Sequence, residues 1–392
     1  MQAVQSGHAT ELNEFLSELG IAVIAHKIVQ WTSSGKIHEK DVIHEIQTEV
    51  ETNKELQVAF DKLIITLGGQ LILRVALREA YLNGIFELCR QLSLAGVDPQ
   101  AAAGGEGTLL DLDGVYTALL TLTPEEHEHW MKGGALKREN HQSALEQLNL
   151  KNRLVIQGDP GSGKSTFVNF VAVCMSGHIL GNEGVNLSLL TTPLSLDKEE
   201  RPQSWDHGAL LPVRITLRDF TARGLPPPGQ NATAEHLWNF LESELRSTSI
   251  EEYAQYMKKE LLEEGGLVLF DGLDEVPEAD QRRAQIKQVV EEFARTYKRC
   301  RILVTSRTYA YQKQEWRLHG FSETILAPFT EGQIRSFVDR WYAHISSKRG
   351  MNRDDALGRA AQLKHAIIHN ERLLALAERP PSVSILVGYF TP

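Results

Sequence analysis

The sequence predicts a three-layer α/β fold built on a parallel sheet, preceded by an all-helical N-terminal region and followed by a small helical subdomain. From Arg153 onward, short apolar runs alternate with stretches whose apolar residues recur at helical spacing, which is typical of parallel strands joined by helices. A glycine-rich loop separates the first apolar run from the first helical stretch. Helical spacing alone marks residues 1 to about 100 and most of 330 to 377.

The glycine-rich loop fits the GxxxxGK(S/T) pattern of a phosphate-binding P-loop, the Walker A motif. An apolar run at 154–156 predicts a buried strand before the loop, and apolar residues at helical spacing from Phe167 to Cys174 predict a helix after it. This strand, loop and helix indicate a P-loop NTPase fold. The loop residues, with the threonine that follows, are Gly158, Asp159, Pro160, Gly161, Ser162, Gly163, Lys164, Ser165 and Thr166.

The chemistry of this loop suits a nucleotide. Glycines let backbone N–H groups wrap a phosphate, and the helix N-terminus adds the positive end of its dipole. We expect Lys164 to reach the β- and γ-phosphates and the Ser165 hydroxyl to ligate Mg²⁺. The expected ligands are therefore ATP or ADP with Mg²⁺.

Length and composition bound the remaining possibilities. The 392 residues suggest two or three domains, and the 42% hydrophobic content supplies ample cores. The formal net charge of −10 argues against nonspecific electrostatic binding to nucleic acid or to an anionic membrane. The 3 cysteines are scattered, which argues against a disulfide framework or a zinc site and favours a reducing cytoplasm. Neither a signal pattern nor an apolar stretch of membrane-spanning length occurs.

The region before the P-loop is predicted to be mostly helical. Apolar residues at 12–19 and 42–50 indicate two helices, a third runs from Lys54 until Gly68-Gly69 breaks it, and a fourth covers about 71–92. Residues 101–107 form a small-residue linker. The run Leu112–Tyr116 suggests a short strand, and 140–150 a connecting helix. His127-Glu128-His129 lacks the spacing of a metal-binding HExxH helix and is expected on a solvated helix.

Further strands are expected at 211–217, 266–271, 301–307 and 324–326, with loops at 177–208 and 224–230. In a parallel sheet, ligands lie outside the carboxyl ends of the strands. Asp271 ends an apolar run in the Walker B pattern and is expected to hold Mg²⁺. A carboxylate of Asp274 or Glu275 is expected to orient or deprotonate the attacking water, the alternative being two acids that only solvate a turn. Arg307 is expected to sense the γ-phosphate, or else to pair with a carboxylate.

These motifs together resemble one family, the NACHT domains. The run Leu267–Glu275 looks like their extended Walker B motif, Ile302–Arg307 like their sensor 1, and Pro212–Phe220 like their second strand. Ala327–Thr330, followed by Gln333-Ile334, resembles the start of their small helical subdomain. Upstream, residues 80–82, 94–98 and 112–116 resemble the lead-in of bacterial NACHT proteins, so the likeness covers about 78–380.

The resemblance implies a signalling ATPase of the STAND class, which holds ADP when off and is ATP-bound and oligomeric when on. It implies slow hydrolysis, antiviral defence in a bacterium, and partners limited to nucleotide, further copies of the chain or a protein trigger. The expected domains are a helical region at 1–100, a lead-in at 108–150, the NACHT nucleotide-binding domain at 151–327, the small helical subdomain at 328–380 and a tail at 381–392.

Two other interpretations stay open. A non-hydrolysing scaffold would bind nucleotide and act through its helical N-terminal region, although the intact Lys164, Ser165, Asp271 and Glu275 favour hydrolysis. A GTPase is disfavoured because no (N/T)KxD guanine motif follows the P-loop. The tail after Pro380 does not resemble the family, so we expect that the chain is truncated or frameshifted. Such a chain would lack the segment that covers ADP, and ADP would exchange rapidly. The alternative is a naturally short variant.

Overall fold

The computed structural model describes residues 54–93, 109–134, 141–195, 200–312, 316–349 and 351–379, together with Val383 and Leu386. The chain divides into two compact units, Met1–Leu77 and Arg78–Pro392. The helices expected at 12–19 and 42–50 and the linker at 101–107 lie outside the described residues. The same holds for the tail at 381–392, apart from the two residues named above.

Helix α5 (Lys54–Arg90) is continuous through Gly68-Gly69, so the predicted break there is wrong. A glycine inside a helix costs about 1 kcal/mol relative to alanine. In α5 this cost is offset because the helix continues for 37 residues without a proline. Each residue added to a helix contributes a further backbone hydrogen bond. In the second unit, one face of α5 is buried at Tyr81, Leu82, Ile85, Phe86 and Cys89.

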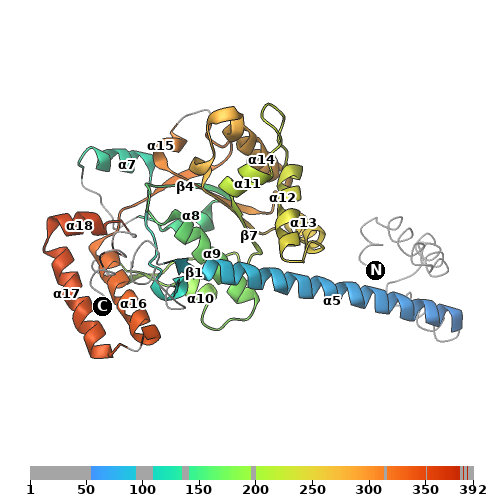
Figure 1. The fold of residues 1–392 in the computed structure, drawn as a ribbon, viewed down its shortest axis with the longest axis horizontal. Coiled ribbons are helices and arrows are strands. Elements are labelled where there is room, and N and C mark those ends of the chain that lie inside the picture. Colours follow the sequence, from blue (N-terminus) through green and yellow to red (C-terminus); the bar gives the residue numbers. More distant parts are fainter. Residues whose placement is uncertain are drawn as a thin grey trace, which may run out of the picture. The chain divides into compact units, whose positions relative to one another are not determined.

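A six-stranded sheet in the order β3-β10-β4-β9-β8-β7 forms the centre of the second unit (Figure 1). The strands β4, β7, β8, β9 and β10 are parallel, and only β3 runs antiparallel to its neighbour β10. The predicted α/β fold is therefore confirmed. The strands are β3 (Thr121–Leu122), β4 (Arg153–Gln157), β7 (Pro212–Thr216), β8 (Leu267–Asp271), β9 (Arg301–Ser306) and β10 (Ser322–Leu326).

Helices cover both faces of this sheet. Phe270 of β8 packs edge-on against Phe293 of α14 (Arg282–Thr296), with ring centroids 6.2 Å apart. The next residue, Asp271, accepts a hydrogen bond from Ser165 of α9 (Lys164–Ile179). Because successive strand residues point to opposite faces, α14 and α9 lie on opposite sides of the sheet.

The connections between the strands supply the remaining helices of the α/β core. They are α11 (Leu217–Arg223), α12 (Ala234–Ser247), α13 (Tyr253–Glu263) and α15 (Thr308–Tyr311). Helix α13 was not predicted, although Tyr253, Met257 and Leu261 are buried at the i, i+4 and i+8 positions of one face. The expected loop at 177–208 also contains α10 (Leu187–Leu190), β5 (Leu194–Ser195) and β6 (Glu200–Arg201), which are too short to leave a periodic pattern.

The segment before the P-loop strand corrects one prediction. The strand expected at Leu112–Tyr116 is helix α6 (Leu112–Val115), because its buried residues Leu112 and Val115 follow helical spacing. The neighbouring strand is β2 (Leu109–Asp111), which pairs with β1 (Gln91–Ser93). The connecting helix expected at 140–150 is α8 (Ala144–Leu150).

Helix α7 (Pro124–Met131) carries His127, Glu128 and His129 and buries none of its residues. Its first turn is closed by a capping box between Thr123 and Glu126. In the described part of the chain, no cluster of three or more histidine, cysteine or acidic residues is arranged to hold a metal ion. The prediction of a solvated helix here is confirmed.

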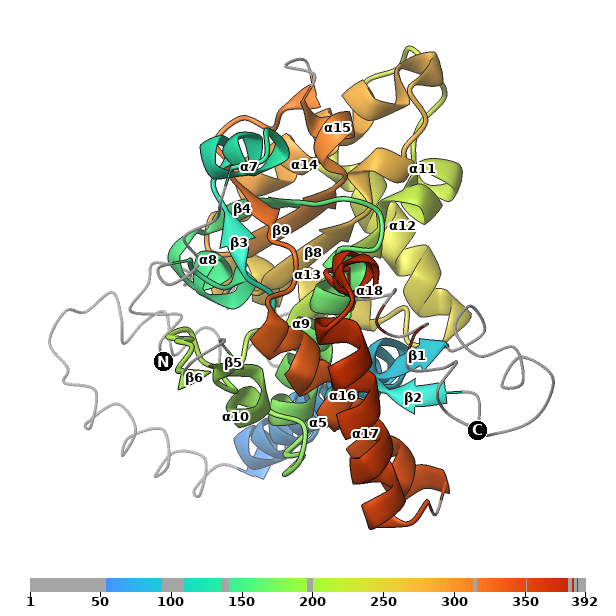
Figure 2. The same ribbon diagram turned by 90° about the vertical axis from the view of Figure 1, so that its left-hand side faces the viewer.

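Three helices follow the sheet and pack on one another: α16 (Glu331–Arg349), α17 (Arg353–Ile368) and α18 (Glu371–Ala377) (Figure 2). Thr330 and Gln333 exchange hydrogen bonds at the start of α16, and the Gln333 amide also donates to Ala118 O at 2.6 Å. The small helical subdomain is thereby joined to the segment before the P-loop. Among the described residues, no helix has the length and apolar character needed to cross a membrane.

Candidate functional site

The P-loop connects β4 to α9 and has the backbone that its glycines predict. Gly161 and Gly163 have φ angles of 78° and 92°, which non-glycine residues rarely adopt. A Cβ atom at Gly158 would run into the Ser162 hydroxyl, so a larger residue here would have to displace that side chain. The Gly158 N–H donates to Ser306 O at 3.2 Å, which ties the loop to the end of β9.

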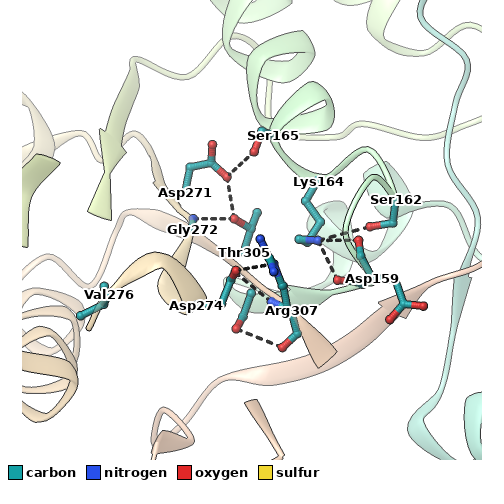
Figure 3. A network of polar contacts seen from close by, with 12 residues as sticks. Asp159, Ser162, Lys164, Ser165, Asp271, Gly272, Asp274, Val276, Thr305 and Arg307 are labelled. Atoms are coloured by element: carbon teal, nitrogen blue, oxygen red, sulfur yellow. Dashed lines mark hydrogen bonds and ion pairs between the residues drawn. The ribbon is translucent and has the colours of Figure 1, made fainter. Parts of the chain in front are cut away.

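Lys164 begins α9, and its side chain folds back over the loop (Figure 3). Its Nζ donates to Gly158 O at 2.7 Å and to Asp159 O at 3.0 Å. Burial lowers the pKa of Lys164, the nearby Asp274 carboxylate opposes this, and Arg307 adds to the lowering. A phosphate oxygen is a stronger acceptor for the ammonium than a neutral carbonyl, so this position suits a nucleotide phosphate.

Asp271 at the end of β8 gathers three partners from other elements. Its Oδ1 accepts hydrogen bonds from Ser165 Oγ at 3.1 Å and from Thr305 Oγ1 at 2.6 Å, and Arg214 Nη2 lies 3.4 Å from Oδ2. The Thr305 hydroxyl also accepts from the Gly272 N–H at 2.9 Å. The carboxylate is only 6% exposed, so these contacts hold its orientation.

The hydroxyl of Ser165 and the carboxylate of Asp271 supply the hard oxygen ligands that Mg²⁺ prefers. They come from the P-loop helix and from β8, and their side chains meet directly. This donor set fits Mg²⁺ held by one or two protein oxygens, the remaining ligands being water and phosphate oxygens. Thr166, which follows Ser165, lies in the first turn of α9 and is half-buried.

Asp274 and Arg307 form an ion pair at the ends of β8 and β9. Arg307 Nε lies 2.8 Å from Asp274 Oδ2, and the Arg307 backbone N–H donates to Asp274 Oδ1 at 3.0 Å. The Asp274 side chain is 6% exposed and that of Arg307 is 38% exposed. In Figure 3 this pair lies across from Lys164, around the same space at the ends of the strands.

Glu275 lies next to this pair in the short 3-10 helix η3 (Leu273–Glu275). Gly272 begins the turn with a φ of 85°, and a Cβ atom there would lie 3.3 Å from Glu275 Cδ. The Glu275 side chain is exposed, and among the described residues its carboxylate has no hydrogen-bond or ion-pair partner. Glu275 is therefore accessible to water.

A pocket opens beside the P-loop, and the sequence patterns did not indicate it. Its volume is about 110 Å³, which is smaller than the roughly 300–1,000 Å³ usual for a whole small-molecule site, so it suits one part of a ligand. One wall comes from the loop itself and from the end of β10. The others come from α7 and α18, and the main contributors are Asp159, Pro160, Trp130, Pro328, Glu378 and Arg379.

The helical subdomain is attached to the sheet at this pocket. The Phe329 N–H donates to Glu378 O at 2.9 Å, and Arg379 Nη2 lies 4.0 Å from Asp159 Oδ2. The pocket therefore has walls from segments far apart in the sequence, and a bound molecule here would touch the P-loop and α18 together.

In a comparison with protein families, residues 152–344 match the family model of the NACHT domain. This part of the chain is a NACHT domain. The matched range contains β4, the P-loop, β7 to β10 and most of α16, so the site residues outside it are those of α7, of α18 and of the two positions after α18. A comparison with curated proteins finds no match.

The match confirms the resemblance drawn from the motifs, and with it the P-loop NTPase fold. NACHT domains are nucleotide-binding NTPase switches of the STAND type, so the chain is a nucleotide-binding protein. Thr305, Arg214 and the pocket beside the P-loop were missed by the sequence patterns. Thr305 belongs to the Thr-Ser-Arg end of β9, and this position next to the Walker B strand was the available signal for it.

Proposed function

We propose that this NACHT protein is an ATP switch that binds ATP with Mg²⁺ and hydrolyses it slowly. The observation that carries this proposal is the hydrogen bond between Ser165 and Asp271, which brings the Walker A and Walker B motifs together at 3.1 Å across 106 residues of sequence. Lys164 lies beside them with an ammonium already directed at the loop. The groups suited to bind phosphate and Mg²⁺ therefore lie at one edge of the sheet, where phosphoryl-transfer enzymes bind their nucleotide.

Each residue has a role that follows from its contacts. Lys164 neutralises charge on the β- and γ-phosphates, and Ser165 with Asp271 holds Mg²⁺, which when bound offsets the charge of the transferring phosphoryl group. Glu275 accepts the proton of the attacking water, because it is an exposed carboxylate without a partner among the described residues.

Arg307 contacts the γ-phosphate through its two Nη groups. Only its Nε is used by Asp274, and a guanidinium has five N–H donors in a planar fork. Asp274 therefore orients Arg307 without consuming the donors that a phosphate needs. Arg307 would thus have both of the roles that the sequence left open for it: it pairs with a carboxylate and it contacts the γ-phosphate.

The nucleotide base binds in the pocket beside the P-loop. Trp130 offers an aromatic surface there, and Pro328 and Ala327 offer apolar contacts. The absence of a guanine-specific motif after the P-loop supports adenine as the base. Bound ATP would then join the P-loop to α18, which is a route from the nucleotide to the helical subdomain.

Calorimetry on the full chain tests the proposal. Wild-type protein is expected to bind ATP with Mg²⁺, and Lys164→Ala to bind it at least about tenfold more weakly, because a charge-assisted contact to phosphate is lost. Asp271→Ala is expected to abolish Mg²⁺-dependent phosphate release. Unchanged affinity in Lys164→Ala would refute the site.

We also propose that the switch serves antiviral defence in a bacterium. This rests on the resemblance of residues 80–82, 94–98 and 112–116 to the lead-in of bacterial NACHT proteins. The test is phage challenge of a bacterial host expressing the wild-type chain or Lys164→Ala. Protection by the wild type alone supports the role, and equal plaque counts for the two refute it.

A further inference from the structure

Arg283, the second residue of α14, reaches back to the acidic loop that carries Asp274 and Glu275. Its Nε donates to Val276 O at 2.8 Å, and its Nη2 donates to Asp274 O at 3.3 Å. These two carbonyls bracket Glu275 in the chain. In Figure 3, Val276 lies on the side of the loop away from Lys164, so this backbone is held from behind the site.

The guanidinium of Arg283 is itself fixed. Its Cζ lies 4.1 Å from the centre of the Trp316 ring, and its Nη1 lies 3.1 Å from Glu278 Oε1. The side chain is only 11% exposed. A cation stacked on an aromatic face and screened from water is held firmly, and a planar fork can serve two carbonyls and a carboxylate at once.

The loop needs such support because its own structure is weak. The 3-10 helix η3 has three residues, and helices of this kind have poor hydrogen-bond geometry. Between the loop and α14, Asp280 and Gln281 have φ angles of 58° and 57°, a conformation unfavourable for residues with a Cβ atom. Local preference therefore does not determine the path of this segment, and tertiary contacts must do so.

We propose that Arg283 is a positioning residue for hydrolysis, which holds the backbone on both sides of Glu275 and so aims its carboxylate at the attacking water. The inference rests on the proposed role of Glu275 as the base. Asp274 is then held twice, by Arg283 at its carbonyl and by Arg307 at its carboxylate. We call the contacts of Arg283 with the carbonyls of Asp274 and Val276 the clamp. The rate of an enzyme falls steeply when a catalytic group is displaced by about 1 Å, so loss of the clamp is expected to lower turnover more than nucleotide binding.

Arg283→Lys keeps the charge and removes the fork, and Arg282→Lys is its matched control. Arg282 precedes it on α14 and also donates to a loop carbonyl, Pro226 O at 2.6 Å, but not to the acidic loop. Hydrogen exchange of the full chain is measured first. In Arg283→Lys the amides of 272–276 are expected to exchange at least about tenfold faster, with β8 and β9 as protected as in the wild type. Wild-type exchange at 272–276, or an equal loss across the whole sheet, would overturn the clamp.

Hydrolysis is measured second. Arg283→Lys is expected to lower kcat about tenfold with the Kd for ATP within about twofold, and to have no further effect in a Glu275→Gln background, because both changes act through one residue. If Arg283→Lys lowered kcat by the same factor in the wild type and in the Glu275→Gln background, the positioning role would be overturned. If the wild-type chain hydrolyses no ATP, the proposed function fails, and the exchange measurement still decides whether Arg283 holds the loop.

Discussion

Arg307 and Asp274 are joined by two contacts, one from the side chain and one from the backbone of the arginine. The second contact holds Asp274 Oδ1 against the end of β9, so the pair is built into the sheet edge rather than into a mobile surface. With Nε engaged, the Nη groups of Arg307 are the donors available to a third phosphate.

Arg307→Ala is expected to weaken ATP binding by about tenfold or more while leaving the affinity for ADP within about twofold, because only ATP carries the γ-phosphate. Asp274→Asn is expected to show the same selective loss, since it releases Arg307 from its orientation. Paired titrations with ATP and ADP measure this selectivity. Equal losses for both nucleotides would count against the sensor role.

Glu275→Gln keeps the shape of the side chain and removes its basicity. ATP binding is expected to persist while hydrolysis slows by about 10²-fold or more, the usual contribution of a general base. Single-turnover phosphate release measures the change, with Glu252→Gln, an exposed acid on the N-terminal side of α13, as the control. If Glu275→Gln turned over at the wild-type rate, water activation would have to be assigned to Asp274.

At the scale of elements, α5 is attached to the edge strand of the sheet. The Tyr81 hydroxyl donates to Pro212 O of β7 at 2.9 Å, and its ring lies 5.4 Å from that of Tyr253 on α13. Beside it, Arg78 makes a bidentate pair with the buried Glu260. Burial raises the pKa of Tyr81 well above its ordinary value, so the hydroxyl is protonated and can donate at neutral pH.

Tyr81→Phe removes this donor and leaves a buried carbonyl short of one partner. It is expected to lower the free energy of unfolding by about 1–2 kcal/mol, with the slope of urea unfolding unchanged. Tyr256→Phe on α13 is the control, because its half-buried hydroxyl has no hydrogen-bond partner among the described residues and its loss is expected to cost less than about 0.5 kcal/mol. Equal stabilities of the two variants would show that the Tyr81 hydrogen bond does not anchor α5.

For the whole molecule, the P-loop and the helical subdomain share contacts. Arg379 faces Asp159 of the P-loop, and Glu378 accepts a backbone hydrogen bond from Phe329. A ligand shifts a conformational equilibrium only by binding two states differently. ATP and ADP differ at the γ-phosphate, and on our proposal Arg307 and Lys164 contact that phosphate. The two nucleotides could therefore favour different conformations of the site and of the helical subdomain.

Glu275→Gln with ATP and Mg²⁺ is therefore expected to self-associate, because it retains the γ-phosphate that the wild type removes. Light scattering after size-exclusion chromatography measures the mass, with ADP and Lys164→Ala as the two controls that should leave the mass unchanged. An identical mass in ATP and in ADP would argue against a nucleotide-driven assembly.

Linear patterns were sufficient for the parallel sheet, the P-loop NTPase fold and the NACHT family. Each of these depends on residues adjacent in sequence, whose spacing reflects the period of a strand or helix or the backbone geometry of one loop. The same local logic failed at Gly68-Gly69 and at Leu112–Tyr116, where helix propagation and burial outweighed the local signal.

Only the folded chain decided which partners surround the acids. Thr305 and Arg214 reach Asp271 from the strands on either side of β8, and Arg283 reaches the Glu275 loop from α14. The pocket beside the P-loop takes walls from α7 and α18, which lie outside the α/β core of the sheet. These contacts depend on strand order and on how helices pack across the sheet, and neither is encoded in the spacing of neighbouring residues.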